Sequence, residues 1–350
     1  MLRSLNYTSY PSSTNYTEIV DVRSPLEFSE DRIPGAINLP VLDNEERVIV
    51  GKIYKQESPF KARKIGAALV AKNISNYLSN YLFNKDKDYK PLVYCWRGGQ
   101  RSNSFALVLS QIGWDISVIE GGYKTYRAYV RQELSLLPQQ YNYQIISGLT
   151  GTGKTYILRQ LATKGLQILD LEKLANHRGS LFGEEWAEKS PSQPSQKWFE
   201  SLLLQELQKF DISQTVWVES ESNKIGKLCL PASLWDALKK AKSWEIQLPL
   251  GERVNWLLQQ YPHLTASPDL LKSKLTLLKY RYSSKIIQQW YDLIDRKKWK
   301  ELVENLLIYH YDPAYLRSLA RSYNQVEKQI NLPDLYPQNV DRAIELILSN

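Results

Sequence analysis

The sequence predicts an α/β protein with two successive parallel-sheet domains and a helical C-terminal region. Three observations support this prediction. Short apolar runs alternate with helical stretches in both halves of the chain. A chain of 350 residues exceeds one core of ordinary size, so two or three domains are expected. Residues 136–140 have the composition of a linker, and we expect domains at residues 1–138, 139–265 and 266–350.

The first domain is expected to contain a parallel sheet. Residues 17–22, 91–94 and 116–119 form short apolar runs typical of strands. Residues 103–112 are typical of a helix, because their apolar side chains suit a buried or half-buried face. Strands that alternate with helices need crossover connections, which favour parallel pairing.

A cysteine loop follows directly from the strand at residues 91–94. Its sequence, CWRGGQRS at residues 95–102, can turn successive backbone amides toward the Cys95 sulfur. Arg97, Arg101 and the positive end of the next helix would all favour the thiolate. Such a thiolate attacks electrophilic sulfur, selenium or phosphorus, and the same loop stabilises an attached anion. Cys95, Arg97 and Arg101 are therefore the candidate catalytic residues.

The other cysteine, Cys229, lies between apolar residues and is expected to be a buried packing residue. Two cysteines and three scattered histidines exclude a disulfide framework and a cysteine-rich zinc site. No structural metal is expected.

The second domain is expected to open with a strand at residues 143–146, followed by a glycine loop. Residues 166–170 and 215–219 are short apolar runs that end in an acid, and residues 244–248 form a further candidate strand. From about residue 270 onward the pattern is helical, with large apolar residues at spacings of three and four.

The glycine loop at residues 148–155 (GLTGTGKT) matches the P-loop pattern at every fixed position, between a strand and a helix. Its glycines let the backbone turn its amides inward, and the helix N-terminus adds positive potential. The lysine would neutralise phosphate oxygens, and the last threonine would hold a magnesium ion if one is bound. The predicted phosphate-binding residues are Gly148, Thr150, Gly151, Thr152, Gly153, Lys154 and Thr155.

Sites of this type also need an acid on a neighbouring strand end. Asp170, Glu219 and Glu221 are the candidates for a metal shell or for substrate contacts. The order Glu-Ser-Glu departs from the usual apolar run followed by Asp, which weakens the case for ordinary ATP hydrolysis. Arg253 could close over the phosphates, or it could be a surface arginine, and the sequence leaves both open.

The net charge of the chain is +8, which fits a polyanionic partner such as a nucleic acid. A solvated basic surface explains the charge equally well. No apolar run approaches the length of a membrane span, and the first residues lack the apolar core of a signal peptide. We therefore expect a cytoplasmic protein without membrane contact.

The cysteine loop resembles that of the rhodanese family. Residues 21–28 (DVRSPLEF) and 33–40 (IPGAINLP) are similar to the segments that open a rhodanese domain, and residues 120–123 (EGGY) to its closing turn. The resemblance implies a rhodanese-like N-terminal domain, followed here by a P-loop NTPase-like domain. The Cys-x5-Arg spacing is one residue longer than that of the common rhodanese loop, and it resembles cysteine phosphatases and arsenate reductases.

The two motifs together resemble the tRNA 2-selenouridine synthase family. Residues 50–56 (VGKIYKQ), 174–180 (LANHRGS) and 309–313 (YHYDP) extend the resemblance over nearly the whole chain. It implies a transferase acting on tRNA that carries 2-thiouridine at the wobble position. A geranyl group from geranyl diphosphate would first be placed on the sulfur, and selenium from selenophosphate would then replace the S-geranyl group. No tightly bound cofactor is expected, and the need for magnesium stays open.

On this resemblance, Cys95 would carry the selenium step and residues 148–155 would hold the prenyl diphosphate. Three other interpretations remain: a rhodanese-type sulfurtransferase with an appended nucleotide-binding domain, a cysteine phosphatase or arsenate reductase, and a non-enzymatic RNA-binding module. The last explains the charge but neither Cys95 nor the P-loop.

Overall fold

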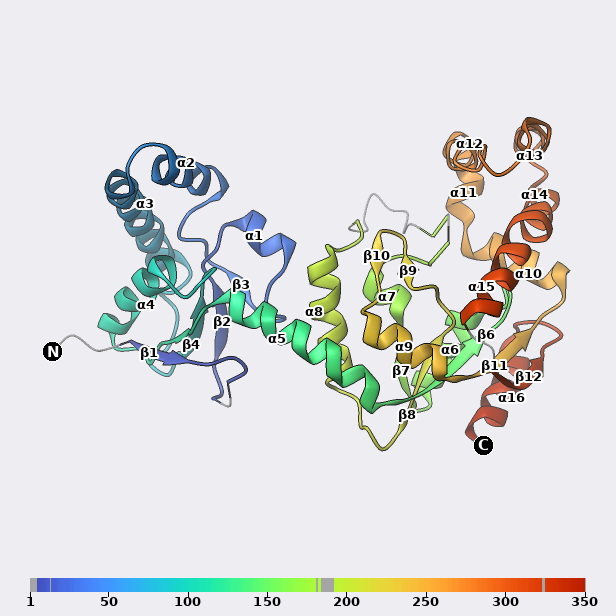
Figure 1. Cartoon of the computed structure of the whole chain (residues 1–350), viewed down its shortest axis with the longest axis horizontal. Helices are drawn as coiled ribbons and strands as arrows, with labels where there is room; N and C mark the ends of the chain where they lie inside the picture. The colour runs from blue at the N-terminus through green and yellow to red at the C-terminus, as the bar shows by residue number, and fades with distance from the viewer. Residues whose placement is uncertain (1–4, 13, 181, 184–191, 323–324, 350) are drawn as a thin grey trace. The chain divides into compact units, whose positions relative to one another are not determined.

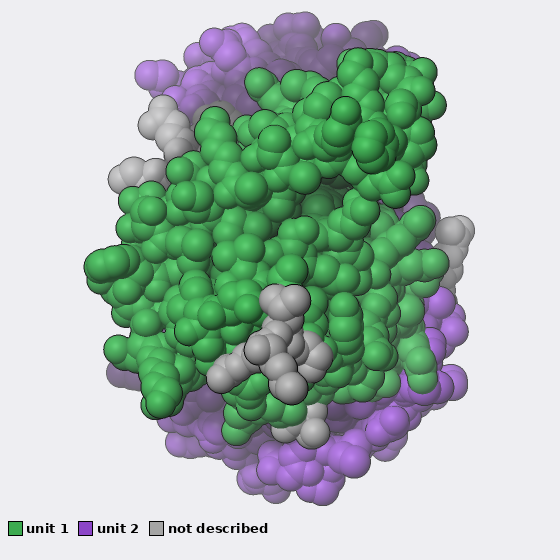
Figure 2. All heavy atoms as spheres, turned by 90° about the vertical axis from the view of Figure 1, so that its left-hand side faces the viewer, with its two compact units in different colours: residues 1–134, 195–205 green, residues 135–194, 206–350 purple. Residues whose placement is uncertain are grey.

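The chain folds into two compact units (Figure 2), and each contains its own parallel sheet (Figure 1). The computed structural model describes residues 5–12, 14–180, 182–183, 192–322 and 325–349. Unit 1 comprises Met1–Leu134 and Ser195–Gln205, and unit 2 comprises Ser135–Pro194 and Glu206–Asn350. The division at residues 138 and 265 stays a prediction.

Unit 1 contains a five-stranded sheet whose strands all pair in parallel. Its order is β1 (Asn6–Thr8), β5 (Ser117–Ile119), β4 (Pro91–Tyr94), β2 (Glu18–Asp21) and β3 (Ile37–Asn38). The three strands predicted from apolar runs are confirmed. The two outer strands are too short and too polar to stand out in the sequence.

Five helices accompany this sheet: α1 (Pro25–Glu30), α2 (Asn44–Gln56), α3 (Pro59–Asn80), α4 (Gln100–Ile112) and α5 (Tyr123–Leu136). The core lies between sheet and helices, where Val93, Phe105 and Val118 are fully buried. Residues 195–205 also belong to this unit, since Ser201 Oγ donates to Asp31 Oδ1 at 2.8 Å.

Unit 2 contains a second five-stranded parallel sheet. Its order is β12 (Val326–Asn331), β11 (Lys242–Gln247), β6 (Asn142–Ser147), β8 (Thr215–Glu219) and β7 (Gln167–Leu169). The helical interpretation of the C-terminal region is wrong at β12. This strand lies at the sheet edge and is mostly exposed, so its sequence lacks the apolar run that identifies the other strands.

A short antiparallel pair, β9 (Lys224–Ile225) and β10 (Leu228–Cys229), lies outside the main sheet of unit 2. Cys229 is exposed there, so the expectation that it packs in a core is wrong. On a two-residue strand, Leu228 points inward and its neighbour points to solvent.

The helices of unit 2 form two groups. Those around the sheet are α6 (Lys154–Thr163), α7 (Leu171–Ala175), α9 (Ala232–Lys240), α10 (Leu250–Gln260) and α16 (Pro337–Leu348). A 3-10 turn, η1 (Leu137–Gln140), precedes β6, and α8 (Gln196–Leu207) lies largely in unit 1. The others are α11 (Pro262–Ala266), α12 (Pro268–Thr276), α13 (Ser284–Asp295), α14 (Trp299–Leu306), the π-helical turn η2 (Leu307–Tyr311) and α15 (Asp312–Ser322).

The two groups have separate apolar clusters. Ile146, Ile157 and Ile344 belong to the cluster beside the sheet. Helices α11 to α14 lie together (Figure 1) and share a cluster around the fully buried Trp290. Within the described residues, no helix is both long enough and apolar enough to cross a membrane.

Candidate functional sites

Unit 1 positions Cys95 at the carboxyl end of β4, as the first residue of the loop that leads into α4. Two glycines allow the loop to fold tightly against the turn after β5. Gly122 has φ of +58°, and a Cβ there would lie 2.3 Å from the Cys95 carbonyl oxygen. That oxygen accepts a 2.8 Å hydrogen bond from the Tyr123 backbone N–H. Gly98, with φ of +62°, would meet the Ile119 carbonyl oxygen at 2.6 Å. The EGGY turn at residues 120–123 therefore packs directly against the cysteine loop and fixes its position.

The Cys95 sulfur is 3% exposed and has two polar neighbours from the start of α4. The Gly99 backbone N–H donates to Sγ at 3.3 Å, and Ser102 Oγ lies 3.2 Å from Sγ. Burial by itself disfavours the thiolate, but hydrogen bonds from Ser102 and the charge of Arg101 outweigh it, so the pKa of Cys95 is lowered. The loop therefore presents an activated thiol, and Ser102 is the contributor that sequence reasoning missed.

The two arginines of the loop occupy different environments. Arg101 forms a bidentate ion pair with Glu27 at 2.7 and 3.3 Å. Glu27 also accepts from the Ser24 backbone N–H at 3.1 Å and so closes the first turn of α1. These partners hold the pKa of Glu27 low despite its partial burial. Arg97 is exposed. Thus Arg101 is held beside the thiol by an acid from the DVRSPLEF segment, whereas Arg97 faces solvent.

In unit 2, β6 leads into the phosphate loop and α6 leaves it. Gly148, Gly151 and Gly153 all have positive φ, at +147°, +85° and +75°. A Cβ at Gly148 would lie 2.6 Å from the Ile246 carbonyl oxygen, so the loop needs glycine there. Thr152 is buried and donates to the Leu149 carbonyl oxygen at 2.9 Å. The loop therefore depends on glycine at positions where another residue would be strained or would clash.

Lys154 folds back over the loop. Its Nζ donates to the Gly148 carbonyl oxygen at 2.9 Å and lies 5.3 Å from the centre of the Tyr315 ring. The Tyr315 hydroxyl accepts from the Gly148 backbone N–H at 2.9 Å and lies 2.9 Å from Ser220 Oγ. Tyr315 therefore joins the loop to the end of β8. Nothing in the sequence indicated this role, because α15 is far from the loop along the chain.

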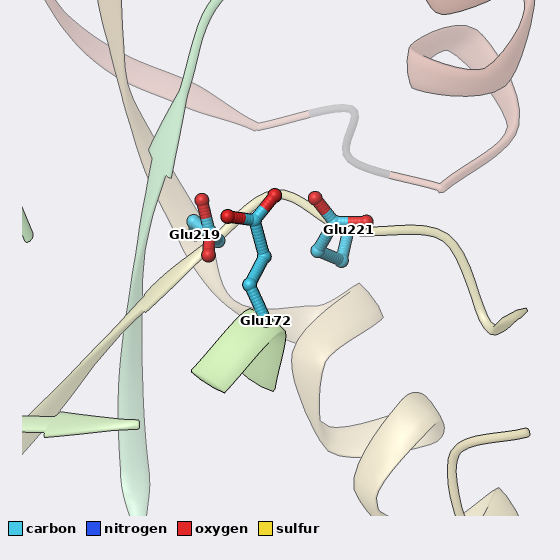
Figure 3. Close-up of side chains that lie close together, drawn as sticks. All are labelled: Glu172, Glu219 and Glu221. Atoms are coloured by element: carbon cyan, nitrogen blue, oxygen red, sulfur yellow. The ribbon is translucent and has the colours of Figure 1, made fainter. Parts of the chain in front are cut away.

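Three carboxylates gather beside Thr155 (Figure 3). Thr155 Oγ1 lies 2.6 Å from Glu219 Oε2 and 3.2 Å from Glu172 Oε2. Oxygens of Glu172, Glu219 and Glu221 all lie within 4.8 Å of one another. Glu172 comes from α7, and the other two come from the end of β8 and the loop after it. The sequence missed Glu172, although its place two residues after a strand-end acid is a usable signal.

These carboxylates are shifted strongly toward their protonated forms. Burial is the largest cause, and their mutual repulsion adds to it, so the pKa of each is raised to about 8, against the opposing charge of Lys154. Glu219 Oε1 is buried without a hydrogen-bond partner. Carboxylate and hydroxyl oxygens in this arrangement suit a hard divalent cation such as Mg²⁺. Glu219, one of the candidate strand-end acids named from the sequence, lies at the end of β8 beside the phosphate loop.

Two other predicted residues lie outside this group. Asp170 caps α7 by accepting from the Lys173 backbone N–H at 2.9 Å, and it pairs with Arg159 at 2.7 Å. Arg253 is buried rather than on the surface, and it forms a bidentate pair with Asp312 in which both contacts are 2.8 Å. Arg253 also donates to the Thr150 carbonyl oxygen at 3.1 Å, so it supports the backbone of the phosphate loop.

A cavity of about 740 Å³ opens from the phosphate loop within unit 2. Its polar end is lined by Gly151, Lys154 and Thr155 with the three carboxylates. Much of the remaining wall comes from α10 to α15 and is largely apolar, with Arg281 and His310 among its polar residues. The apolar lining includes Trp256, Leu264, Leu271, Trp299, Leu302 and Leu306. The site therefore fits a ligand with a phosphate group at one end and a hydrocarbon at the other.

Comparisons with known proteins match a different domain family to each of the two units. A family model described as the tRNA 2-selenouridine synthase AAA domain matches residues 141–274, and a rhodanese-like domain model matches residues 9–129. The tRNA 2-selenouridine synthase of Nitrosomonas europaea is 31% identical over 353 residues, covering 87% of this chain and 90% of that protein. That of Bdellovibrio bacteriovorus is 32% identical, covering 87% of this chain and 89% of that protein.

Among solved structures, a rhodanese-related protein from Thermoplasma volcanium matches 32% of this chain and 77% of its own, at 22% identity and a TM-score of 0.21. The rhodanese-like character of unit 1 rests on the family model and on its sheet, not on this likeness.

Proposed function

This chain belongs to the tRNA 2-selenouridine synthase family, and from that premise we propose that it converts wobble 2-thiouridine in tRNA to 2-selenouridine by way of an S-geranyl intermediate. Its donors would be geranyl diphosphate and selenophosphate. As a tRNA-modifying enzyme it would act in the cytoplasm.

The observation that best supports the prenyl step is the two-ended cavity of unit 2. Its polar end at Lys154 and Thr155 suits a diphosphate, and its apolar end suits a ten-carbon chain. In the proposed step the uridine sulfur bonds to the first carbon of the geranyl group as the carbon–oxygen bond to diphosphate breaks. Lys154 would stabilise the negative charge that the departing diphosphate gains.

We further propose that a magnesium ion binds with the donor. Thr155, Glu172, Glu219 and Glu221 would hold it, and its charge would help to neutralise the diphosphate. Among the described acids, cysteines and histidines, only the three glutamates lie close enough together to form such a group.

For the selenium step we propose Cys95 as the attacking thiolate. Its sulfur would bond to the phosphorus of selenophosphate as the phosphorus–selenium bond breaks, and water would later release phosphate from Cys95. The selenide set free would bond to C2 of the uridine as the bond from C2 to the S-geranyl group breaks and geranyl thiolate leaves. The lowered pKa of Cys95 supports this assignment, because the thiolate is the reactive form. Arg101, held by Glu27, would counter the charge of an anionic donor.

Mass spectrometry of nucleosides tests the proposal most directly. The protein is incubated with thiolated tRNA, geranyl diphosphate and selenophosphate, and each donor is omitted in turn. We expect S-geranyl-2-thiouridine without selenophosphate, and 2-selenouridine with both donors. Formation of 2-selenouridine at full rate without geranyl diphosphate would contradict the S-geranyl route.

Two variants separate the steps. Cys95→Ser should keep geranylation and lose selenation, and surviving selenation would remove Cys95 from the reaction. Lys154→Ala should lose geranyl transfer at limiting donor while tRNA still binds. Cys229→Ser is the matched control, because its thiol is exposed and lies in neither site.

A cysteine phosphatase or arsenate reductase is the second candidate, since the Cys95 loop combines the Cys-x5-Arg spacing with an amide directed at the sulfur. Hydrolysis of an aryl phosphate, lost in Cys95→Ser, would favour it. If the protein hydrolyses no aryl phosphate but forms 2-selenouridine, this second candidate is excluded.

A further inference from the structure

The positive charge of the chain is concentrated around α13. Residues 268–300 contain nine Lys and Arg against three Asp and Glu, in a chain whose whole excess is +8. Two of these cations are neutralised, Lys272 by Asp295 and Lys298 by Glu301. Six others are exposed and form no ion pair within the described part of the chain: Lys279, Arg281, Lys285, Arg296, Lys297 and Lys300.

Three of the lysines line a hollow at the junction of α13 and α14. The hollow has a volume of about 440 Å³, and its wall includes Lys297, Lys298 and Lys300 together with Glu301, the partner of Lys298. Leu258 and Trp299 line both this hollow and the main cavity. A group of cations therefore adjoins the cavity proposed for the prenyl donor.

The backbone at this junction is unusual for a lysine. Lys297 has φ of +53°, in the left-handed region that favours glycine or asparagine after a helix. Stability alone would favour glycine at this position. A lysine that keeps this conformation places its charge next to that of Lys298, which is consistent with a role in binding.

A second group of cations lies at the opposite end of α13. Lys279, Arg281 and Lys285 flank Tyr280, whose side chain is 100% exposed. Arg281 also lines the main cavity. Because α13 has 12 residues, the two groups are roughly 18 Å apart along its axis, a span that covers several successive phosphates of one strand.

From these observations we propose that the lysine hollow (Lys297, Lys298 and Lys300) binds backbone phosphates of the substrate tRNA beside the mouth of the prenyl cavity. The group at residues 279–285 would hold the strand farther along, with Tyr280 stacked on a base. This inference rests on the proposed function for its substrate. Phosphate contacts of this kind set the position of the RNA, so they would direct the thiolated base to the donor.

Unit 1 offers one competing surface. Residues 44–80, which include α2 and α3, contain seven Lys and Arg against three Asp and Glu. The lysine hollow is the better candidate because it shares wall residues with the cavity. The test therefore includes a variant of each surface.

The test compares three full-length variants, each losing three exposed lysines. The first is K297Q/K298Q/K300Q in the hollow. The second is K52Q/K55Q/K72Q on α2 and α3. The third, K164Q/K227Q/K240Q, is the control, because it removes the same charge from scattered positions of unit 2.

The dissociation constant for thiolated tRNA is measured at several salt concentrations, together with that for geranyl diphosphate. We expect the hollow variant to bind tRNA about tenfold or more weakly, with a salt slope smaller by about two to three. Its affinity for geranyl diphosphate should match the wild type, and its loss of modification should appear in KM for tRNA.

Equal tRNA affinity and salt slope in the hollow and control variants would overturn this inference. So would a loss confined to the variant of α2 and α3, which would assign the RNA to that surface. Either result leaves the proposed function intact if the wild-type protein still forms 2-selenouridine. If it forms none, the proposed function itself fails.

Discussion

At the Cys95 sulfur, two effects of opposite sign meet. Burial disfavours the charged thiolate, whereas hydrogen bonds and a nearby guanidinium favour it, and the balance lowers the pKa. Ser102 is the largest favourable contributor, and it comes from the first turn of α4. The reactivity of the cysteine therefore depends on one hydroxyl at least as much as on the charge of Arg101.

Replacing Ser102 by alanine should raise the pKa of Cys95 by about one to two units, since a hydrogen bond to a charged group contributes about 1.5–3 kcal/mol. The thiolate absorbance is titrated in a Cys229→Ser background, which leaves one thiol. Ser110→Ala is the control, because its hydroxyl is also buried on α4 and donates to the Leu107 carbonyl oxygen, as that of Ser102 does to Gly99, but only Ser102 also contacts the Cys95 sulfur. Identical titrations for both variants would remove Ser102 from the argument.

Gly122 is the residue on which the closing turn depends. Gly122→Ala would place a methyl group 2.3 Å from the Cys95 carbonyl oxygen, whereas Gly35→Ala, also at positive φ, would meet nothing within 4 Å. The Gly35 variant should lose about 1–2 kcal/mol for the left-handed backbone alone. The Gly122 variant should lose at least about 2 kcal/mol more.

Hydrogen exchange of peptides from β4 and α4 measures the difference between the two glycine variants. Equal protection in both would show that the loop can move away from the turn without cost.

At the scale of elements, the buried strands were predictable, whereas three of the four edge strands of the two large sheets, β1, β3 and β12, were not. The fourth, β7, coincides with an apolar run. The strand β4 consists of four buried residues, so its apolar run shows in the sequence and locates the cysteine loop that follows. The strand β12 has one buried residue and is defined by its pairing with β11. Pairing of that kind is set by tertiary structure and leaves little trace in a local pattern.

The same reasoning explains which site residues were found. The P-loop is a local motif, so Lys154 and Thr155 could be identified from eight consecutive letters. Glu172 and Tyr315 join it from α7 and α15, and only the fold brings them there.

The contribution of β12 to unit 2 can be measured directly. Ile330 is 5% exposed and packs in the cluster beside the sheet, whereas Val326 on the same strand is 42% exposed. Ile330→Ala should destabilise unit 2 by about 2–4 kcal/mol, and Val326→Ala by less than about 1 kcal/mol. Urea denaturation of the full chain gives both values. Equal losses would show that the strand acts only through its backbone.

At the scale of the whole molecule, the two units have separate apolar cores and separate candidate sites. A ligand stabilises the unit that binds it, by an amount set by its concentration relative to its dissociation constant. The proposal that unit 2 binds the prenyl donor and unit 1 carries the selenium step can therefore be tested without measuring either reaction.

Geranyl diphosphate with magnesium, at about one hundred times its dissociation constant, should stabilise unit 2 by about 2.7 kcal/mol. Hydrogen exchange followed by mass spectrometry should show slower exchange in β6 and α6 and unchanged exchange in β4 and α4. Lys154→Ala should abolish the effect. Equal protection of β4 and α4 would contradict the assignment of the donor to unit 2.

The three carboxylates beside Thr155 also affect how many protons the protein takes up from the buffer on folding. Their pKa values rise from 4.5 to about 8 on folding, so between these values the folded chain holds more protons than the unfolded chain. Their contribution to stability therefore falls as pH rises through this range. A divalent cation that binds them must expel those protons to solvent. Its measured binding heat will then depend on the ionisation enthalpy of the buffer, and it will bind more tightly in alkaline solution.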